Sequence, residues 1–177
     1  MTEFDTRVRR VRPEQWRLGT PCRGWSVHDL VNHLVHEQLW APELLAGCTA
    51  EQVGDRFEGD RLGSDPLHAW VLAAAAAREA WIEPDALQRS VHLGAGRSTA
   101  VEYGWRMALD LGVHAWDLAR AIGAPDRLDP DLAAALLDHA TAHAAELRGS
   151  GVFGPPVPTP ENAPAQDRLV ALLGRAP

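Results

Sequence analysis

Apolar residues recur along most of this chain at intervals of three and four positions. This spacing places their side chains on one face of an α-helix. Near the start, Phe4, Val8 and Val11 follow it and predict a short amphipathic helix. Pro13 lacks a backbone N–H and fixes its own φ, so we expect it to interrupt or end this first helix.

A second helix is predicted to begin at Ser26. Ser26 and Asp29 form a capping-box pattern that follows a turn-forming Gly-Thr-Pro-Cys-Arg-Gly segment. Regularly spaced valines and leucines carry the helix toward Gly47, and Pro42 predicts a kink or break near its far end.

Further helices are predicted over Pro66–Trp81, Ser98–Gly123, Pro130–Arg148 and Ala165–Leu173. Residues 47–66 are poor in large apolar side chains and predict a long connection, and the Gly- and Pro-rich residues 149–164 predict irregular chain. Only Val91–Leu93 is strand-like, and it is too short to support a sheet alone. The pattern therefore predicts an all-α helical bundle in which the long connection is a crossover.

Composition narrows the protein class. The 177 residues have a length typical of one domain, so we expect residues 1–177 to form a single domain, monomeric or homodimeric. The sequence has no secretory start and no apolar run of membrane-spanning length, which predicts a soluble, cytoplasmic protein without a membrane partner. A net charge of -7 and the absence of a basic stripe argue against nucleic acid.

The strongest candidate chemistry is a divalent metal site. Asp110 and His114 lie four residues apart in a predicted helix, so both side chains leave the same face. His33, among leucines of the second helix, is the best third ligand, and three protein ligands would leave a coordination position open. The alternative is that these histidines are simply hydrogen-bonded.

Two nearby residues have competing interpretations. Asp117, three residues after His114, could orient the ligand imidazole from behind, or it could be a solvated helix charge. Arg106 could bind a substrate carboxylate, but we favour an ion pair with Asp110 one turn along, or a surface position.

Other metal-ligand and thiol residues are weaker candidates. His139 and His143 repeat the four-residue spacing and form a rival metal site for which the sequence offers no third ligand. His28 and His36 are expected at the periphery, and the tryptophans mainly in the core. The two cysteines lack paired spacing, and we interpret Cys22 as a structural thiol.

Five segments of the chain resemble the DinB superfamily, particularly actinobacterial proteins like the N-terminal domain of mycothiol-dependent maleylpyruvate isomerase. The resemblance covers nearly the whole chain. The segments are residues 24–34 (GWSVHDLVNHL), 54–60 (GDRFEGD), 110–120 (DLGVHAWDLAR), 153–158 (FGPPVP) and 166–169 (QDRL).

This resemblance implies a DinB-like four-helix bundle with short extra C-terminal helices and a metal held by His33, Asp110 and His114. The isomerase branch typically has Glu where this chain has Asp110, so the shorter arm could shift the ion or insert a water. That isomerase also has a C-terminal domain contributing to its active site, for which we find no counterpart here. We therefore do not expect maleylpyruvate isomerisation itself.

The function expected from these observations is a metal-dependent enzyme, a thiol transferase or isomerase, acting on a small thiol and an electrophilic substrate. Mycothiol is the thiol that the family suggests, and all 17 basic residues being arginine fits a GC-rich actinobacterial source. Zinc is the first choice of metal, with nickel or iron as alternatives. A hydrolase at the same site, or a non-catalytic metal-binding or partner module, are the competing functions.

Overall fold

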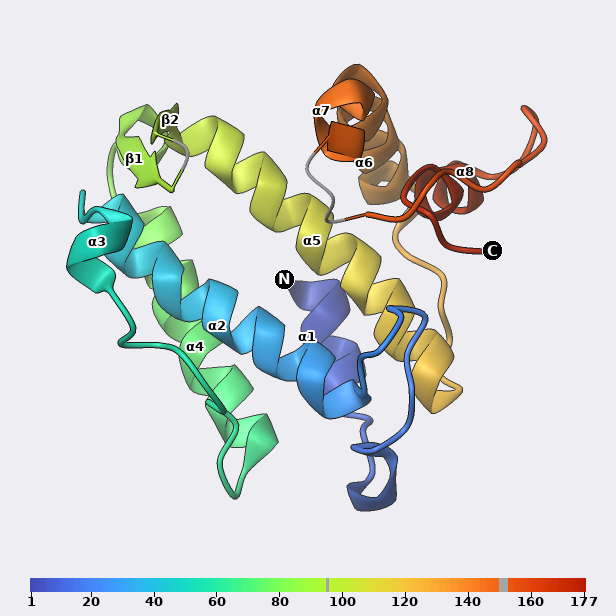
Figure 1. Cartoon of the computed structure of the whole chain (residues 1–177), viewed down its shortest axis with the longest axis horizontal. Coiled ribbons are helices and arrows are strands. Elements are labelled where there is room, and N and C mark those ends of the chain that lie inside the picture. The colour runs from blue at the N-terminus through green and yellow to red at the C-terminus, as the bar shows by residue number, and fades with distance from the viewer. Residues whose placement is uncertain (95, 150–152) are drawn as a thin grey trace.

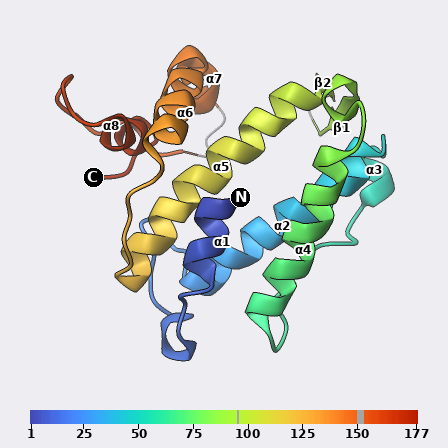
Figure 2. The same cartoon turned by 180° about the vertical axis from the view of Figure 1, so that it is seen from behind.

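The computed structural model describes residues 1–94, 96–149 and 153–177. Its centre is formed by three long helices, α2 (Val27–Leu45), α4 (Pro66–Ile82) and α5 (Ala100–Ile122), with the short α1 (Thr2–Val8) packed against α4 and α5. Figures 1 and 2 show α2 and α5 side by side and running in opposite directions, with α4 behind α2. The predicted all-α bundle is confirmed.

The helix starts follow from local capping. At α2, the Ser26 hydroxyl accepts from the Asp29 N–H while the Asp29 carboxylate accepts from the Ser26 N–H, as the sequence predicts. The helix continues through Pro42 to Leu45. Thr99 and Glu102 form the same reciprocal cap on α5. The preceding strand runs to Thr99 and the helix begins at Ala100, so the predicted start at Ser98 is two residues too early.

The helices are held together by three clusters of buried apolar residues. The largest joins α1, α2, α4 and α5 around fully buried Phe4, Leu34, Trp70 and Leu118. A second lies at the hairpin end of α2 and α5, and a third joins α5 to the C-terminal helices. Within the described residues, no helix is both long enough and apolar enough to cross a membrane.

A β-hairpin precedes α5, which the sequence analysis did not predict. Strands β1 (Ser90–Leu93) and β2 (Gly96–Thr99) pair antiparallel, with Ser90 opposite Thr99. Val91 is completely buried in the second cluster, so packing against the bundle supports strands that would be too short alone. The expectation of no sheet is therefore wrong at this point.

Other differences are short elements within the predicted connections and helices. The crossover after α2 contains α3 (Ala50–Val53), and 3-10 turns occupy Pro13–Gln15 and Ala86–Gln88. The predicted fifth helix is divided into α6 (Pro130–Ala142) and α7 (Ala144–Gly149). Residues 153–164 contain no helix or strand, as predicted, whereas residues 150–152 of that stretch lie outside the described chain. The last helix, α8 (Ala165–Leu172), packs on α6.

Candidate metal centre

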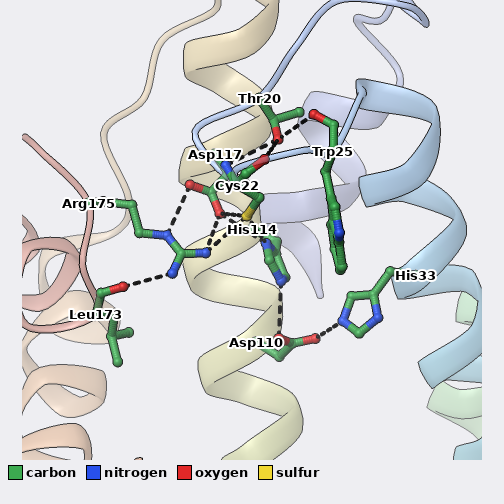
Figure 3. Close-up of polar contacts among 9 residues, drawn as sticks. All are labelled: Thr20, Cys22, Trp25, His33, Asp110, His114, Asp117, Leu173 and Arg175. Carbon is green, nitrogen blue, oxygen red and sulfur yellow. Dashed lines mark hydrogen bonds and ion pairs between the residues drawn. The ribbon is translucent and has the colours of Figure 1, made fainter. Parts of the chain in front are cut away.

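The three predicted metal ligands meet between α2 and α5. The Asp110 carboxylate lies between two imidazoles, with Oδ2 3.0 Å from His33 Nε2 and Oδ1 3.2 Å from His114 Nε2. Figure 3 shows Asp110 and His114 projecting from the same face of α5 toward His33 on α2. The antiparallel pairing of the two helices thus brings together residues 77 positions apart in sequence.

This donor set fits a divalent ion. One ligand atom from each of His33, Asp110 and His114 can be chosen so that all lie within 4.8 Å of one another. Around a tetrahedral zinc with bonds of about 2.0–2.1 Å, neighbouring ligand atoms are about 3.3 Å apart, which lies within this limit. Two imidazoles and one carboxylate suit zinc, nickel or iron equally.

Asp110 and His114 stabilise each other's charged forms. Burial by itself would raise the pKa of Asp110, but the charge of His114 and hydrogen bonds from both imidazoles hold it well below its usual range. Burial alone would lower the pKa of His114, yet Asp110, together with hydrogen bonds to Asp117 and Cys22, raises it well above its ordinary value. The two shifts oppose each other in sign and both favour an ion pair between His114 and Asp110.

Asp117 lies behind His114 and is completely buried, so it is not a solvated helix charge. Its Oδ2 lies 3.0 Å from His114 Nδ1, on the opposite side of the ring from Asp110. A hydrogen bond from Nδ1 to Asp117 fixes the ring orientation and directs Nε2 toward Asp110 and His33.

Arg175, close to the end of the chain, neutralises Asp117. Its guanidinium donates from Nη2 to Asp117 Oδ2 at 2.9 Å and from Nε to Oδ1 at 3.3 Å. A third bond, from Nη1 to the Leu173 carbonyl at 2.8 Å, fixes the side chain (Figure 3). The sequence analysis missed Arg175 because 58 residues separate it from Asp117 and no local spacing links them.

Cys22 also reaches this site, which the interpretation as a structural thiol did not anticipate. Its sulfur donates to Asp117 Oδ2 at 3.1 Å and accepts from Arg175 Nη2 at 3.1 Å. Cys22, His114 and Asp117 form a second group with metal-ligand geometry. The guanidinium of Arg175 opposes a cation there, so the His33 group is the better metal site.

Trp25 covers the imidazoles from the loop before α2. Its ring centroid lies 5.0 Å from that of His33 and 5.8 Å from that of His114, nearly parallel to the latter. The Trp25 carbonyl accepts from the Thr20 N–H and hydroxyl at 2.9 and 3.0 Å, which fixes the loop. An apolar ring at this position shields one side of the ligand set from water.

The other side of the ligand set opens into a cavity of about 860 Å³. Its wall is built from α2, α5, the α6–α7 corner and the C-terminal segment. The lining residues include His33, Glu37, Tyr103, Asp110, His114, His143, Phe153 and Arg175. The candidate ligands therefore face a space large enough for a drug-sized molecule.

The remaining predicted site residues line the same cavity but do not belong to the ligand set. Arg106 pairs with Glu146 at 3.1 Å and is half exposed, and no ion pair among the described residues joins it to Asp110. The His139 ring stacks on Trp105 with ring centroids 4.8 Å apart, and its centroid lies 4.3 Å from that of His143. Within the described part of the chain, neither histidine belongs to a group with metal-ligand geometry.

Most residues of this site lie within a segment that matches a known family. The family model described as "Mycothiol maleylpyruvate isomerase N-terminal domain" matches residues 1–119, which include His33, Asp110, His114 and Asp117. The chain belongs to this family. The resemblance predicted from the sequence is thus confirmed, while Arg175 lies beyond the matched residues.

The chain is also similar to a curated relative and to a solved structure. The chain is 33% identical to an uncharacterized protein of Mycobacterium tuberculosis, in strains CDC 1551 / Oshkosh and ATCC 25618 / H37Rv, over 97% of this chain and 91% of the relative. The crystal structure of a mutant of the mycothiol-dependent maleylpyruvate isomerase matches with a TM-score of 0.62 at 17% identity, covering 82% of this chain. The match spans 64% of the isomerase chain, and it supports the fold.

Proposed function

We propose that this protein is a metal-dependent enzyme that binds a low-molecular-weight thiol, mycothiol, and transfers or adds it to an electrophilic small molecule. The observation that carries the proposal is the open His33, Asp110 and His114 set at one wall of the 860 Å³ cavity. The choice of mycothiol as the thiol rests on the name of the family to which the chain belongs.

The residues of the site would have three roles, which are metal binding, orientation of an imidazole and stabilisation of a buried charge. A divalent ion bound by His33, Asp110 and His114 would favour the thiolate form of a coordinated thiol and polarise a substrate carbonyl or epoxide. Asp117 holds the His114 Nδ1 proton, so that Nε2 presents its lone pair toward the ligand set. Arg175 keeps Asp117 charged and in place.

The size and openness of the cavity favour this function over its competitors. A closed structural metal site is normally surrounded by protein ligands, whereas this ligand set borders open space. A cavity of about 860 Å³ accommodates a thiol together with a second reactant, which a hydrolase acting on a small ester does not need.

The test begins with metal content measured by elemental analysis in three proteins. We expect about one equivalent of metal in the wild type and in the control His139→Ala/His143→Ala variant, which removes an equivalent helical pair. The His33→Ala/His114→Ala variant should lose the metal. Metal retained in that variant would exclude the proposed ligand set.

Thiol binding is then measured by calorimetry on the zinc-loaded wild type with mycothiol and with S-alkylated mycothiol. Heat from mycothiol alone, lost in the His33→Ala/His114→Ala variant, supports the thiol function. Equal binding of both compounds, or of neither, argues against it. Metal-dependent cleavage of activated esters without any thiol would favour the hydrolase instead.

A further inference from the structure

The cavity continues from the metal ligands along the groove between α2 and α5. Glu37 lies one helical turn after His33, and Tyr103 lies two turns before Asp110. Because α2 and α5 run in opposite directions (Figure 1), Glu37 and Tyr103 are displaced from the metal ligands toward the same end of the groove. Both residues line the cavity, about 6–10 Å from the metal ligands by helical rise.

Tyr103 carries a polar group without a partner. The residue is only 4% exposed, and no described residue hydrogen-bonds its buried hydroxyl. Its ring is fixed by packing on Trp81, with centroids 5.5 Å apart. A buried hydroxyl without a partner is uncommon in native proteins and marks a place where a polar atom from outside the chain can bind.

Glu37 gives this end of the cavity an acceptor. Burial raises the pKa of Tyr103, the negative charge of Glu37 raises it further, and both residues line the same cavity. The Glu37 side chain is 34% exposed, and its ion-pair contact is a long one of 3.7 Å to His36. No short ion pair among the described residues therefore occupies this carboxylate.

Neighbouring charges decide which ligands this end of the cavity accepts. Arg106, the nearest cationic residue of α5 in the cavity wall, is already paired with Glu146. Glu102 is occupied in capping α5. What remains is the Glu37 carboxylate and the Tyr103 hydroxyl, which disfavour carboxylates and phosphates and suit groups that donate hydrogen bonds.

We propose that Glu37 and Tyr103 form a second binding point, which holds a hydroxyl- or amine-bearing part of the ligand whose reacting atom lies at His33, Asp110 and His114. The ligand donates to the Glu37 carboxylate and exchanges a hydrogen bond with the Tyr103 hydroxyl. This inference extends the proposed function, since it places the part of the ligand that carries no thiol.

The test uses D-glucosamine, an amine with several hydroxyls and no thiol, titrated into isotope-labelled protein and followed by backbone amide NMR shifts. In the wild type we expect shifts around residues 35–39 and 101–105. Tyr103→Phe keeps the ring and Glu37→Gln keeps the shape, and each should weaken binding at least about tenfold, the value of one hydrogen bond to a charged or buried group. Glu51→Gln removes an exposed α3 carboxylate outside the cavity wall and should bind as the wild type does.

The outcomes separate this inference from the proposed function. Unshifted amides in the wild type, or unchanged binding in both cavity variants, would overturn the second binding point. Because D-glucosamine has no thiol and the titration needs no metal, its result does not depend on whether mycothiol binds. Failure of mycothiol to bind while D-glucosamine shifts these amides would reject the thiol function alone.

Discussion

Asp117 Oδ2 lies 3.0 Å from His114 Nδ1, on the side of the imidazole ring that faces away from Asp110. His114 is therefore held between two carboxylates, one on each ring nitrogen. The outer carboxylate sets which nitrogen carries a proton, and the inner one belongs to the candidate metal site.

Replacing Asp117 with Asn should weaken metal binding by about 10–100-fold, because the amide holds the His114 ring less firmly and makes the imidazole less basic. Zinc affinity measured by competition with a chelator checks this. Asp126→Asn, which removes a surface ion pair with Arg120, is the matched control and should leave the affinity unchanged. Equal affinities in both variants would contradict the orienting role.

Metal affinity should also depend on pH. Because the pKa of His114 is raised well above 6.5, a proton must leave the imidazole before Nε2 can bind an ion. Between pH 6.5 and the raised pKa, apparent zinc affinity should increase about tenfold for each pH unit. His114→Gln should abolish this slope, and a flat profile in the wild type would show that no proton is released.

The metal-free protein should show the opposite trend in stability. The raised pKa of His114 contributes stability that is complete below pH 6.5 and is lost as pH rises through the folded-state pKa. The lowered pKa of Asp110 contributes stability above pH 3.8 that is lost as pH falls. Urea unfolding with a chelator present should therefore give the largest difference between wild type and His114→Gln at pH values between 3.8 and 6.5.

Removing Arg175 should be costly, because the buried Asp117 carboxylate would lose its guanidinium partner. We expect Arg175→Ala to lower the free energy of unfolding by about 3–5 kcal/mol, the usual cost of breaking a buried pair. Arg127→Ala, which removes a side chain 70% exposed and 3.9 Å from Asp167, should change it by less than about 0.5 kcal/mol. Similar losses in both variants would indicate a general effect of losing arginine.

Gln38 offers a stabilising substitution. It is completely buried in α2, and no described residue hydrogen-bonds either atom of its side-chain amide. Gln38→Met keeps a similar shape without the desolvated amide, so the free energy of unfolding should increase by about 1–3 kcal/mol. Gln52→Met, on the exposed helix α3, is the comparison, although it also removes a cap and should be mildly destabilising. A destabilised Gln38→Met protein would mean that the amide has partners.

The parts of the site that the sequence predicted are those encoded by local spacing or by family resemblance. Asp110 and His114 are one turn apart on one helix, and His33 lies in the segment that resembles the family signature. Cys22 and Arg175 reach the site only through the packing of the loop before α2 and of the C-terminal segment, which no periodicity records. The β-hairpin was not predicted for the same reason, because it is stabilised by burial of Val91 against the bundle and not by a local sequence pattern.

The two oxygens of Asp110 lie 3.0 Å from His33 Nε2 and 3.2 Å from His114 Nε2. The distance between α2 and α5 is thus set by the apolar core and by these two contacts together. A metal bound at His33, Asp110 and His114 would join two helices that the apolar core also holds together, unlike small domains that fold only when metal binds. On this proposal, different divalent ions would replace one another without unfolding the chain, and supply in the cell would decide which one binds.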